Sequence, residues 1–124
     1  RPPQEILEFA AEYGDKFELT DSPLQAAKDA DVVITDVWTS MGQEEERAAR
    51  EAAFKGYCVN EELMAQAKPD AMVQHCLPAH RGEEITEEVF EANAKYIFEE
   101  AENRLHAQKA VLVKTMGGSA QGEA

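Results

Sequence analysis

The sequence has few cysteines and no long apolar run, and both deficits exclude classes of protein. Its two cysteines, Cys58 and Cys76, are too few for a disulfide framework or a four-cysteine metal site. We therefore expect free thiols in a reducing compartment. No apolar stretch approaches the roughly 20 residues that a membrane helix needs, and residues 1–5 lack the apolar segment of a signal peptide. These absences favour a cytoplasmic location and no membrane contact.

Basic residues are also scarce. The sequence contains 12 Lys and Arg residues and 25 Asp and Glu residues, which gives a net charge of −13. This balance disfavours nucleic acid, whose phosphates require clustered cations, and disfavours anionic membrane surfaces. An anionic substrate would have to meet its cations locally or on another chain. With 44% hydrophobic and 30% charged residues in 124, the composition is that of one globular domain.

Apolar periodicity and capping residues predict alternating helices and strands. Expected helices cover residues 4–13, 23–30, 43–54, 60–67, 86–92 and 101–116; expected strands cover 17–19, 31–35, 71–75 and 96–98. The β-branched run at 31–35 is typical of a strand buried on both faces. The alternation predicts an α/β fold: a three-layer αβα, Rossmann-like parallel sheet with a long C-terminal helix. Residues 1–116 would form the domain and 117–124 a flexible tail.

The predicted sheet is incomplete. Only two or three good strands are present, whereas a doubly wound sheet has about five or six. The first strand and its turn, where such folds often bind ligands, are absent, and the chain does not begin with Met. We therefore expect strands to be missing on the amino-terminal side.

Polar segments follow the two best strands. Residues 36–42 come after the first and residues 75–82 after the second. Ligands of open α/β sheets bind outside the carboxyl ends of the strands, and adjacent parallel strands would bring both loops to one edge. Asp36, expected to be half-buried at its strand end, is either a structural cap or a ligand for an amino group. Ser40 either caps the following helix or, with nearby backbone amides, faces an anion.

The remaining polar candidates each have an unremarkable interpretation. For Cys76 it is a core thiol, and for His75 it is a satisfied buried or interface histidine in preference to a general base. Leu77-Pro78 is a candidate cis peptide bond, although the default is trans. Arg104, which follows Glu99, Glu100 and Glu102, is either an exposed ion pair or a fixed guanidinium for a carbonyl or phosphate oxygen. His75, Cys76 and His80 lack the paired spacing of zinc modules, so no metal is expected.

Taken together, these segments resemble ornithine carbamoyltransferases. Residues 36–44 look like their Asp-x-Trp-x-Ser-Met-Gly-Gln-Glu loop, and residues 75–78 like their His-Cys-Leu-Pro motif. Residues 79–84 match an extension common in bacterial members, and residues 98–104 resemble the segment that opens their last helix. The resemblance covers nearly the whole chain. The Ser-Met-Gly triplet points to ornithine as the amine.

The resemblance implies a role for each loop. Asp36, helped by the Ser40 hydroxyl, would hold the α-amino group of L-ornithine, and the amide of Met41 would meet its α-carboxylate. Cys76 would lie beside the δ-amino nucleophile.

It also implies how the second substrate, carbamoyl phosphate, is held. The Leu77 carbonyl would bind the carbamoyl nitrogen across a cis Leu77-Pro78 bond, and Arg104 would bind the carbamoyl oxygen. No cofactor is implied. The family's phosphate-binding motifs lie in an amino-terminal domain and do not occur here, and the full enzyme would be a homotrimer. The isolated chain would therefore be inactive.

Two other functions stay open at this point. The chain could belong to a transferase for another amine, such as putrescine or an acylated ornithine, which the Ser40-Met41-Gly42 triplet argues against. It could instead be a noncatalytic α/β binding module or a piece of a nucleotide-binding dehydrogenase. The absence of Gly-x-Gly-x-x-Gly from the sequence weakens the nucleotide interpretation.

Overall fold

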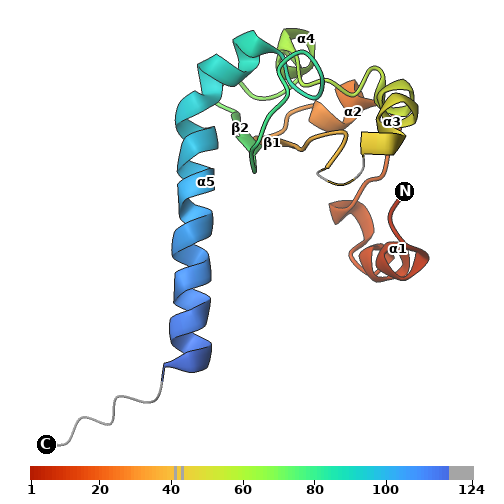
Figure 1. Cartoon of the computed structure of the whole chain (residues 1–124). Coiled ribbons are helices and arrows are strands. Elements are labelled where there is room, and N and C mark those ends of the chain that lie inside the picture. The colour runs from red at the N-terminus through yellow and green to blue at the C-terminus, as the bar shows by residue number, and fades with distance from the viewer. Residues whose placement is uncertain (41, 43, 118–124) are drawn as a thin grey trace, which may run out of the picture.

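The computed structural model describes residues 1–40, 42 and 44–117. Its elements are α1 (Gln4–Ala11), α2 (Pro23–Ala27), β1 (Val32–Thr35), α3 (Arg47–Phe54), α4 (Glu61–Met64), β2 (Met72–His75) and α5 (Glu87–Met116), with 3-10 turns at Gly14–Lys16 and Glu44–Glu46. Figure 1 shows α5 beginning beside the sheet and running well beyond it. No helix in the described ranges is long and apolar enough to cross a membrane.

Polar side chains cap three of the helices at the positions that the sequence predicts. Ser22 Oγ accepts from the Gln25 amide, at 3.3 Å, at the start of α2. Asn60 does the same for α4 and Thr86 for α5. Such caps satisfy amides that have no partner within the helix. The starts of α2, α4 and α5 therefore follow from local hydrogen bonding.

The two central strands form the predicted parallel pair. Val32 lies opposite Met72 and Thr35 opposite His75, so both strands end at the same edge of the sheet. Below them lies the core, in which Val73, Ile85 and Ile97 are fully buried. The parallel sheet and the long C-terminal helix confirm the expected fold class.

Two strand predictions were wrong, and a third was wrong in part. Residues 17–19 form no strand, because no described segment pairs with them and an unpaired strand leaves its backbone hydrogen bonds unmade. Residues 96–98 lie inside α5. The run at 31–35 is a strand but is not buried on both faces, since Ile34 is 69% exposed. No layer of described residues covers that face of β1.

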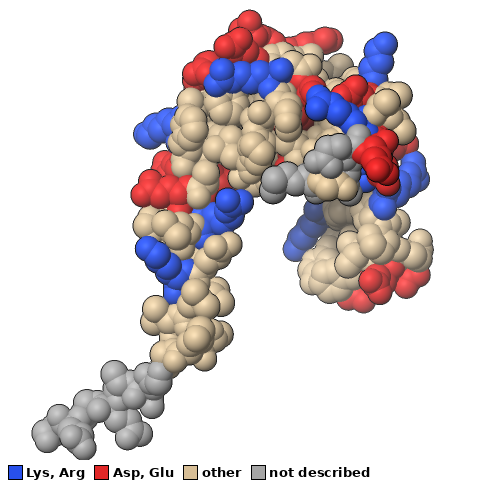
Figure 2. Space-filling model, viewed as in Figure 1, with Lys and Arg blue, Asp and Glu red and all other residues tan. Residues whose placement is uncertain are grey.

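Helix α5 is continuous where the sequence predicted two helices. Asn93, which lies between them, donates to the Val89 carbonyl at 2.9 Å and accepts from the Val73 amide of β2 at 3.3 Å. It therefore joins the helix to the sheet. Towards the C-terminus α5 becomes exposed, with Val113 at 71% and Met116 at 77%, and Figure 2 shows mostly uncharged atoms at this end. The predicted tail begins at Gly117, and residues 118–124 lie outside the described residues.

Candidate functional site

The loops after β1 and β2 meet at the carboxyl edge of the sheet. Asp36 directly follows β1, and Cys76 directly follows β2. The Cys76 thiol donates a hydrogen bond to Asp36 Oδ1 at 3.2 Å, although the residues are 40 positions apart. The predicted juxtaposition of the two loops is therefore confirmed, while the role of each residue remains a proposal.

A cavity of about 370 Å³ opens between these loops. From the first loop it is lined by Asp36, Val37, Thr39 and Ser40, and from the second by Cys76, Leu77, Pro78, His80 and Glu83, with Arg47 of α3 completing it. Met41, the predicted partner of an α-carboxylate, lies outside the described residues. The cavity thus gathers four of the six residues that the sequence selected: Asp36, Ser40, Cys76 and Leu77.

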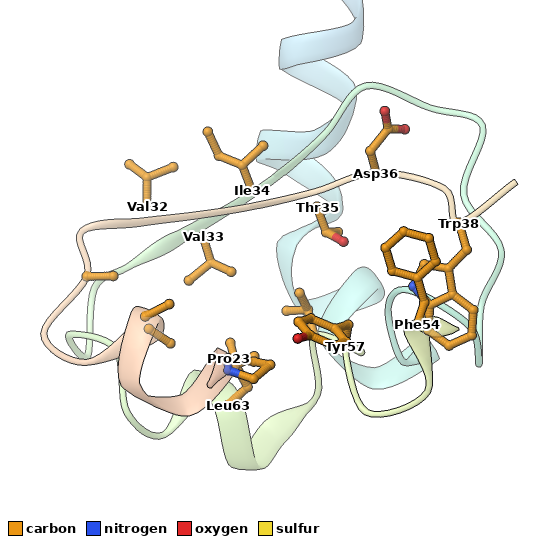
Figure 3. A pocket seen from close by; sticks show the side chains of 14 residues that line it. Pro23, Val32, Val33, Ile34, Thr35, Asp36, Trp38, Phe54, Tyr57 and Leu63 are labelled. Carbon is orange, nitrogen blue, oxygen red and sulfur yellow. The ribbon is translucent and has the colours of Figure 1, made fainter. Parts of the chain in front are cut away.

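Asp36 is exposed, which corrects the expectation that it is half-buried. Its carboxylate lies on the uncovered side of β1: Figure 3 shows it pointing away from the side chains of Thr35 and Tyr57. Asp36 Oδ1 accepts from the Val37 amide at 2.7 Å and from Cys76. No ion pair to Asp36 occurs among the described residues, so the carboxylate remains available for an amino group.

Cys76 is half-buried, and its surroundings favour the protonated thiol. Burial raises the pKa of Cys76, and the hydrogen bond and charge of Asp36 raise it further, with a smaller contribution from Glu100. At neutral pH the group therefore donates a hydrogen bond. A thiol with a raised pKa is a poor nucleophile, so Cys76 is suited to donating a hydrogen bond and not to attacking a carbonyl.

The Asp36 contribution predicts a change in thiol reactivity. In a Cys58→Ser background, Asp36→Asn should increase the rate of Cys76 alkylation by iodoacetamide at pH 8 by about threefold to tenfold, because a lower pKa exposes more thiolate. Mass spectrometry of the modified chain measures the rate. Asp70→Asn, at the opposite end of β2, is the control and should leave it unchanged. An unchanged rate in Asp36→Asn would show that the carboxylate does not tune the thiol.

Leu77 has a φ of +56°, which is rare for a residue with a side chain, and its bond to Pro78 is cis. The left-handed conformation costs about 1–2 kcal/mol. Contacts outside the loop must therefore stabilise it. The expectation of a trans bond from base rates was wrong here, whereas the cis bond implied by the resemblance is present.

His75 and Glu84 form a fully buried pair behind this loop, both with 0% exposure. His75 Nε2 lies 3.0 Å from Glu84 Oε1, and the other ring nitrogen, Nδ1, accepts from the Leu77 amide at 2.9 Å. This confirms the interpretation of His75 as a satisfied buried histidine. The sequence analysis missed Glu84, because nothing in the pair Glu83-Glu84 indicates which carboxylate is buried.

Arg104 approaches the loops from α5. It lines a second cavity of about 320 Å³, which it shares with Cys76 and with Glu100, Ala101, Asn103 and Ala107. Arg104 is exposed and makes no ion pair within the described part of the chain, so the interpretation of an ion pair with its acidic neighbours is not realised. Cys76 therefore lies between Asp36 on one side and the Arg104 cavity on the other.

Arg47 and Glu83 are two further cavity residues that the sequence did not reveal. The Arg47 guanidinium pairs with Glu83 at 2.5 Å and with Glu51 of its own helix. The hydrogen bond to Glu51, and then the charge of Glu83, raise the pKa of Arg47. This pair joins the segment after β1 to the loop after β2. It was not predictable, because the partners are 36 residues apart.

The described residues contain two groups of possible metal ligands, and within each group the ligand atoms lie within 4.8 Å of one another. One group is Asp36, His75 and Cys76, and the other is His80, Glu83 and Glu84. Internal hydrogen bonds already occupy at least one member of each group. Both nitrogens of His75 are used, and Glu83 holds Arg47. The expectation that no metal binds remains a prediction.

A mainly apolar groove of about 390 Å³ lies under β1 (Figure 3) and shares Asp36 with the cavity between the loops. Its lining includes Pro23, Val33, Tyr57 and Leu63. Trp38 stacks on Phe54 there, with ring centroids 6.2 Å apart. With few polar groups, the groove suits packing better than recognition of an amino acid.

Comparisons with known proteins agree with this arrangement. The chain is 54% identical over 118 residues to the ornithine carbamoyltransferase of Methanoculleus marisnigri, covering 95% of this chain and 38% of that protein. The anabolic ornithine carbamoyltransferase of Campylobacter jejuni superposes with a TM-score of 0.83 at 46% identity, covering 90% of this chain and 38% of that one. The Pyrococcus furiosus enzyme superposes with a TM-score of 0.81 at 51% identity, covering 95% and 39%.

The chain thus spans somewhat over a third of the length of the relatives that it matches. The family described as "Aspartate/ornithine carbamoyltransferase, Asp/Orn binding domain" matches residues 2–115. The chain therefore belongs to the aspartate/ornithine carbamoyltransferase family and corresponds to its Asp/Orn-binding domain.

Proposed function

We propose that this chain is the ornithine-binding part of an ornithine carbamoyltransferase. The complete enzyme would transfer the carbamoyl group of carbamoyl phosphate to the δ-amino group of L-ornithine, giving L-citrulline and phosphate. The observation that carries the proposal is the contact between Asp36 and Cys76 at the carboxyl edge of the sheet. It joins two loops that each resemble a motif of the ornithine carbamoyltransferases.

The cavity chemistry supports an amino-acid substrate. Asp36 and Ser40 would hold the α-amino group of ornithine, and the Met41 amide its α-carboxylate. The Cys76 thiol would lie beside the δ-amino group, which must lose its proton before it attacks. Among the described residues that line this cavity, Arg47 is the one side chain with a permanent positive charge, and it is already paired with two glutamates.

Carbamoyl transfer then requires one bond to form and one to break. The δ-nitrogen attacks the carbamoyl carbon, negative charge develops on the carbamoyl oxygen, and the carbon–oxygen bond to phosphate breaks. Arg104 would stabilise the oxygen and the Leu77 carbonyl would orient the carbamoyl nitrogen. The phosphate would be bound by cations on the rest of the enzyme, since the described residues that line the cavity include no such cluster.

The proposal predicts that the isolated chain is inactive and that a completed enzyme is not. The purified chain should bind L-ornithine weakly, with a dissociation constant on the order of 1 mM, and should form no citrulline. We define a chimeric enzyme as the Pyrococcus furiosus enzyme in which this chain replaces the segment that it matches. The chimeric enzyme should form citrulline. Calorimetry and a colorimetric citrulline assay are the measurements.

Substrate comparison separates the proposal from its rivals. The chimeric enzyme should use L-ornithine in preference to putrescine and N-acetylornithine, because only ornithine offers both a free α-amino group and an α-carboxylate. Preference for another amine would assign the chain to a different transferase. An inactive but folded chimeric enzyme would favour a noncatalytic module. The cytoplasmic location and the homotrimer are likewise proposals that follow from the resemblance.

A further inference from the structure

We propose that His75 and Glu84 act as one positioning unit, which holds the loop carrying Cys76 and Leu77 in the conformation that catalysis needs. This inference rests on the proposed function, because it concerns how the same cavity is shaped. Neither residue lines the cavity. Both are fully buried behind it, so they would act through the backbone of the loop and not on the substrate.

Hydrogen bonding determines where the proton of the His75 ring lies. The Leu77 amide donates to Nδ1, so Nδ1 must be an acceptor and carry no proton. The proton of the neutral ring is therefore on Nε2, which donates to Glu84 Oε1. A histidine protonated at Nδ1 would place two N–H groups against each other and lose the contact with Leu77. Glu84 thus selects the tautomer that can bind the loop.

The contact with Leu77 occurs where the loop backbone is least favourable. Leu77 has a left-handed φ of +56°, and its amide points back to the ring two residues earlier. The same Glu84 oxygen also accepts from the His80 amide at 2.6 Å. The buried pair therefore holds the amides on both sides of Pro78 and Ala79, and so determines the path of the chain past the cavity.

Glu84 is connected to the Asp36 loop as well. Its backbone carbonyl accepts from the Val59 amide at 2.8 Å, and the hydroxyl of Thr35, the residue before Asp36, donates to it over 3.5 Å. One residue thus contacts the ends of both strands that present the site. Glu84 Oε2 is buried with no hydrogen-bond partner among the described residues, a cost that an apolar residue of similar size would avoid. A positional role accounts for a carboxylate there.

Paired substitutions separate the two bonds of His75. In His75→Asn, the side-chain amide oxygen can take the place of Nδ1 and accept from the Leu77 amide. In His75→Gln, the longer side chain can donate to Glu84 but no longer accepts from the Leu77 amide. Glu84→Gln keeps an acceptor oxygen for both donors, and Glu84→Ala removes it. His106→Asn is the matched control, since His106 forms an exposed pair with Glu102 at 3.3 Å on α5.

In the chimeric enzyme, His75→Gln and Glu84→Ala should lower kcat by about tenfold to a hundredfold, as expected when reacting groups are misplaced by around 1 Å. The KM for ornithine should stay within about threefold, because neither residue touches substrate. His75→Asn, Glu84→Gln and His106→Asn should retain kcat within about threefold. Equal losses in Glu84→Gln and Glu84→Ala would overturn the proposal, because charge and not geometry would then matter. Full activity in His75→Gln and Glu84→Ala would overturn it too.

A spectroscopic measurement tests the geometry without any activity. Nitrogen-15 NMR of the 124-residue chain at neutral pH should show His75 Nδ1 unprotonated and Nε2 protonated. The Leu77 amide should exchange slowly in the wild-type chain and in His75→Asn, and faster in His75→Gln. A protonated Nδ1 in the wild-type chain would refute the positioning unit even if the variants do not fold. An inactive wild-type chimeric enzyme would refute the proposed function alone, because the NMR result stands by itself.

Discussion

Replacing Arg104 by glutamine in the chimeric enzyme is expected to lower kcat by about 10²–10³-fold. This is the loss usually seen when one donor to a developing oxyanion is removed. The side chain is exposed, lines the cavity that it shares with Cys76, and has no ion-pair partner in the described part of the chain. Its guanidinium is thus available to a substrate oxygen, and steady-state kinetics at saturating ornithine measures the effect.

A conservative variant and a control variant are needed to interpret the Arg104→Gln result. Arg104→Lys should recover only part of the activity, because an ammonium keeps the charge but not the planar fork of the guanidinium. Arg50→Gln is the control: Arg50 pairs with Glu46 at 3.1 Å on the neighbouring segment and lines neither cavity, so its loss should leave kcat unchanged. A kcat within threefold of wild type in Arg104→Gln would remove Arg104 from the mechanism.

Replacing Ile97 by alanine should lower the free energy of unfolding of the chain by about 2–5 kcal/mol, the usual cost of emptying a core site. Ile97 is fully buried and belongs to the core cluster with Val73, Ile85 and Phe90. A small domain is stable by only about 5–15 kcal/mol, so the loss is a large share of the total. Urea unfolding followed by circular dichroism gives the value.

An exposed position on the same helix provides the comparison. Val113→Ala, where the side chain is 71% exposed, should change the free energy of unfolding by less than about 0.5 kcal/mol. Similar effects at the two positions would mean that α5 does not pack through Ile97. The pair therefore tests whether α5 is held in the core at Ile97 and exposed at Val113, as the structure has it.

The error at residues 96–98 has a specific cause. Tyr96, Ile97 and Phe98 are residue types that favour strands, and three residues are too few to reveal a period. In the structure, Phe90, Asn93 and Ile97 recur at helical spacing along the face that meets β2. A prediction from the helix period over the longer window would have found them. The strand prediction at 17–19 fails for a different reason. The local pattern there is compatible with a strand, but no described strand lies beside it.

Much of the site followed from the sequence alone. The β-branched run at 31–35 and the second strand candidate at 71–75 predict parallel strands, and parallel neighbours place the residues after them at one edge. Strand order alone therefore predicted that Asp36 and Cys76 lie close together, as they do in the structure. Helix caps at Ser22, Asn60 and Thr86 followed from local hydrogen bonding as well. These features depend on neighbouring residues or on strand order, and both are encoded in short patterns.

Only the tertiary structure decided what surrounds those two loops. Whether Glu84 or its neighbour Glu83 is buried depends on His75 and on Thr35, which is 49 residues away. The exposure of Asp36 depends on which face of β1 is covered, and the pairing of Arg47 with Glu83 on how α3 approaches the second loop. Burial and ion pairing are set by contacts between distant segments, and no local pattern of residue types carries that information.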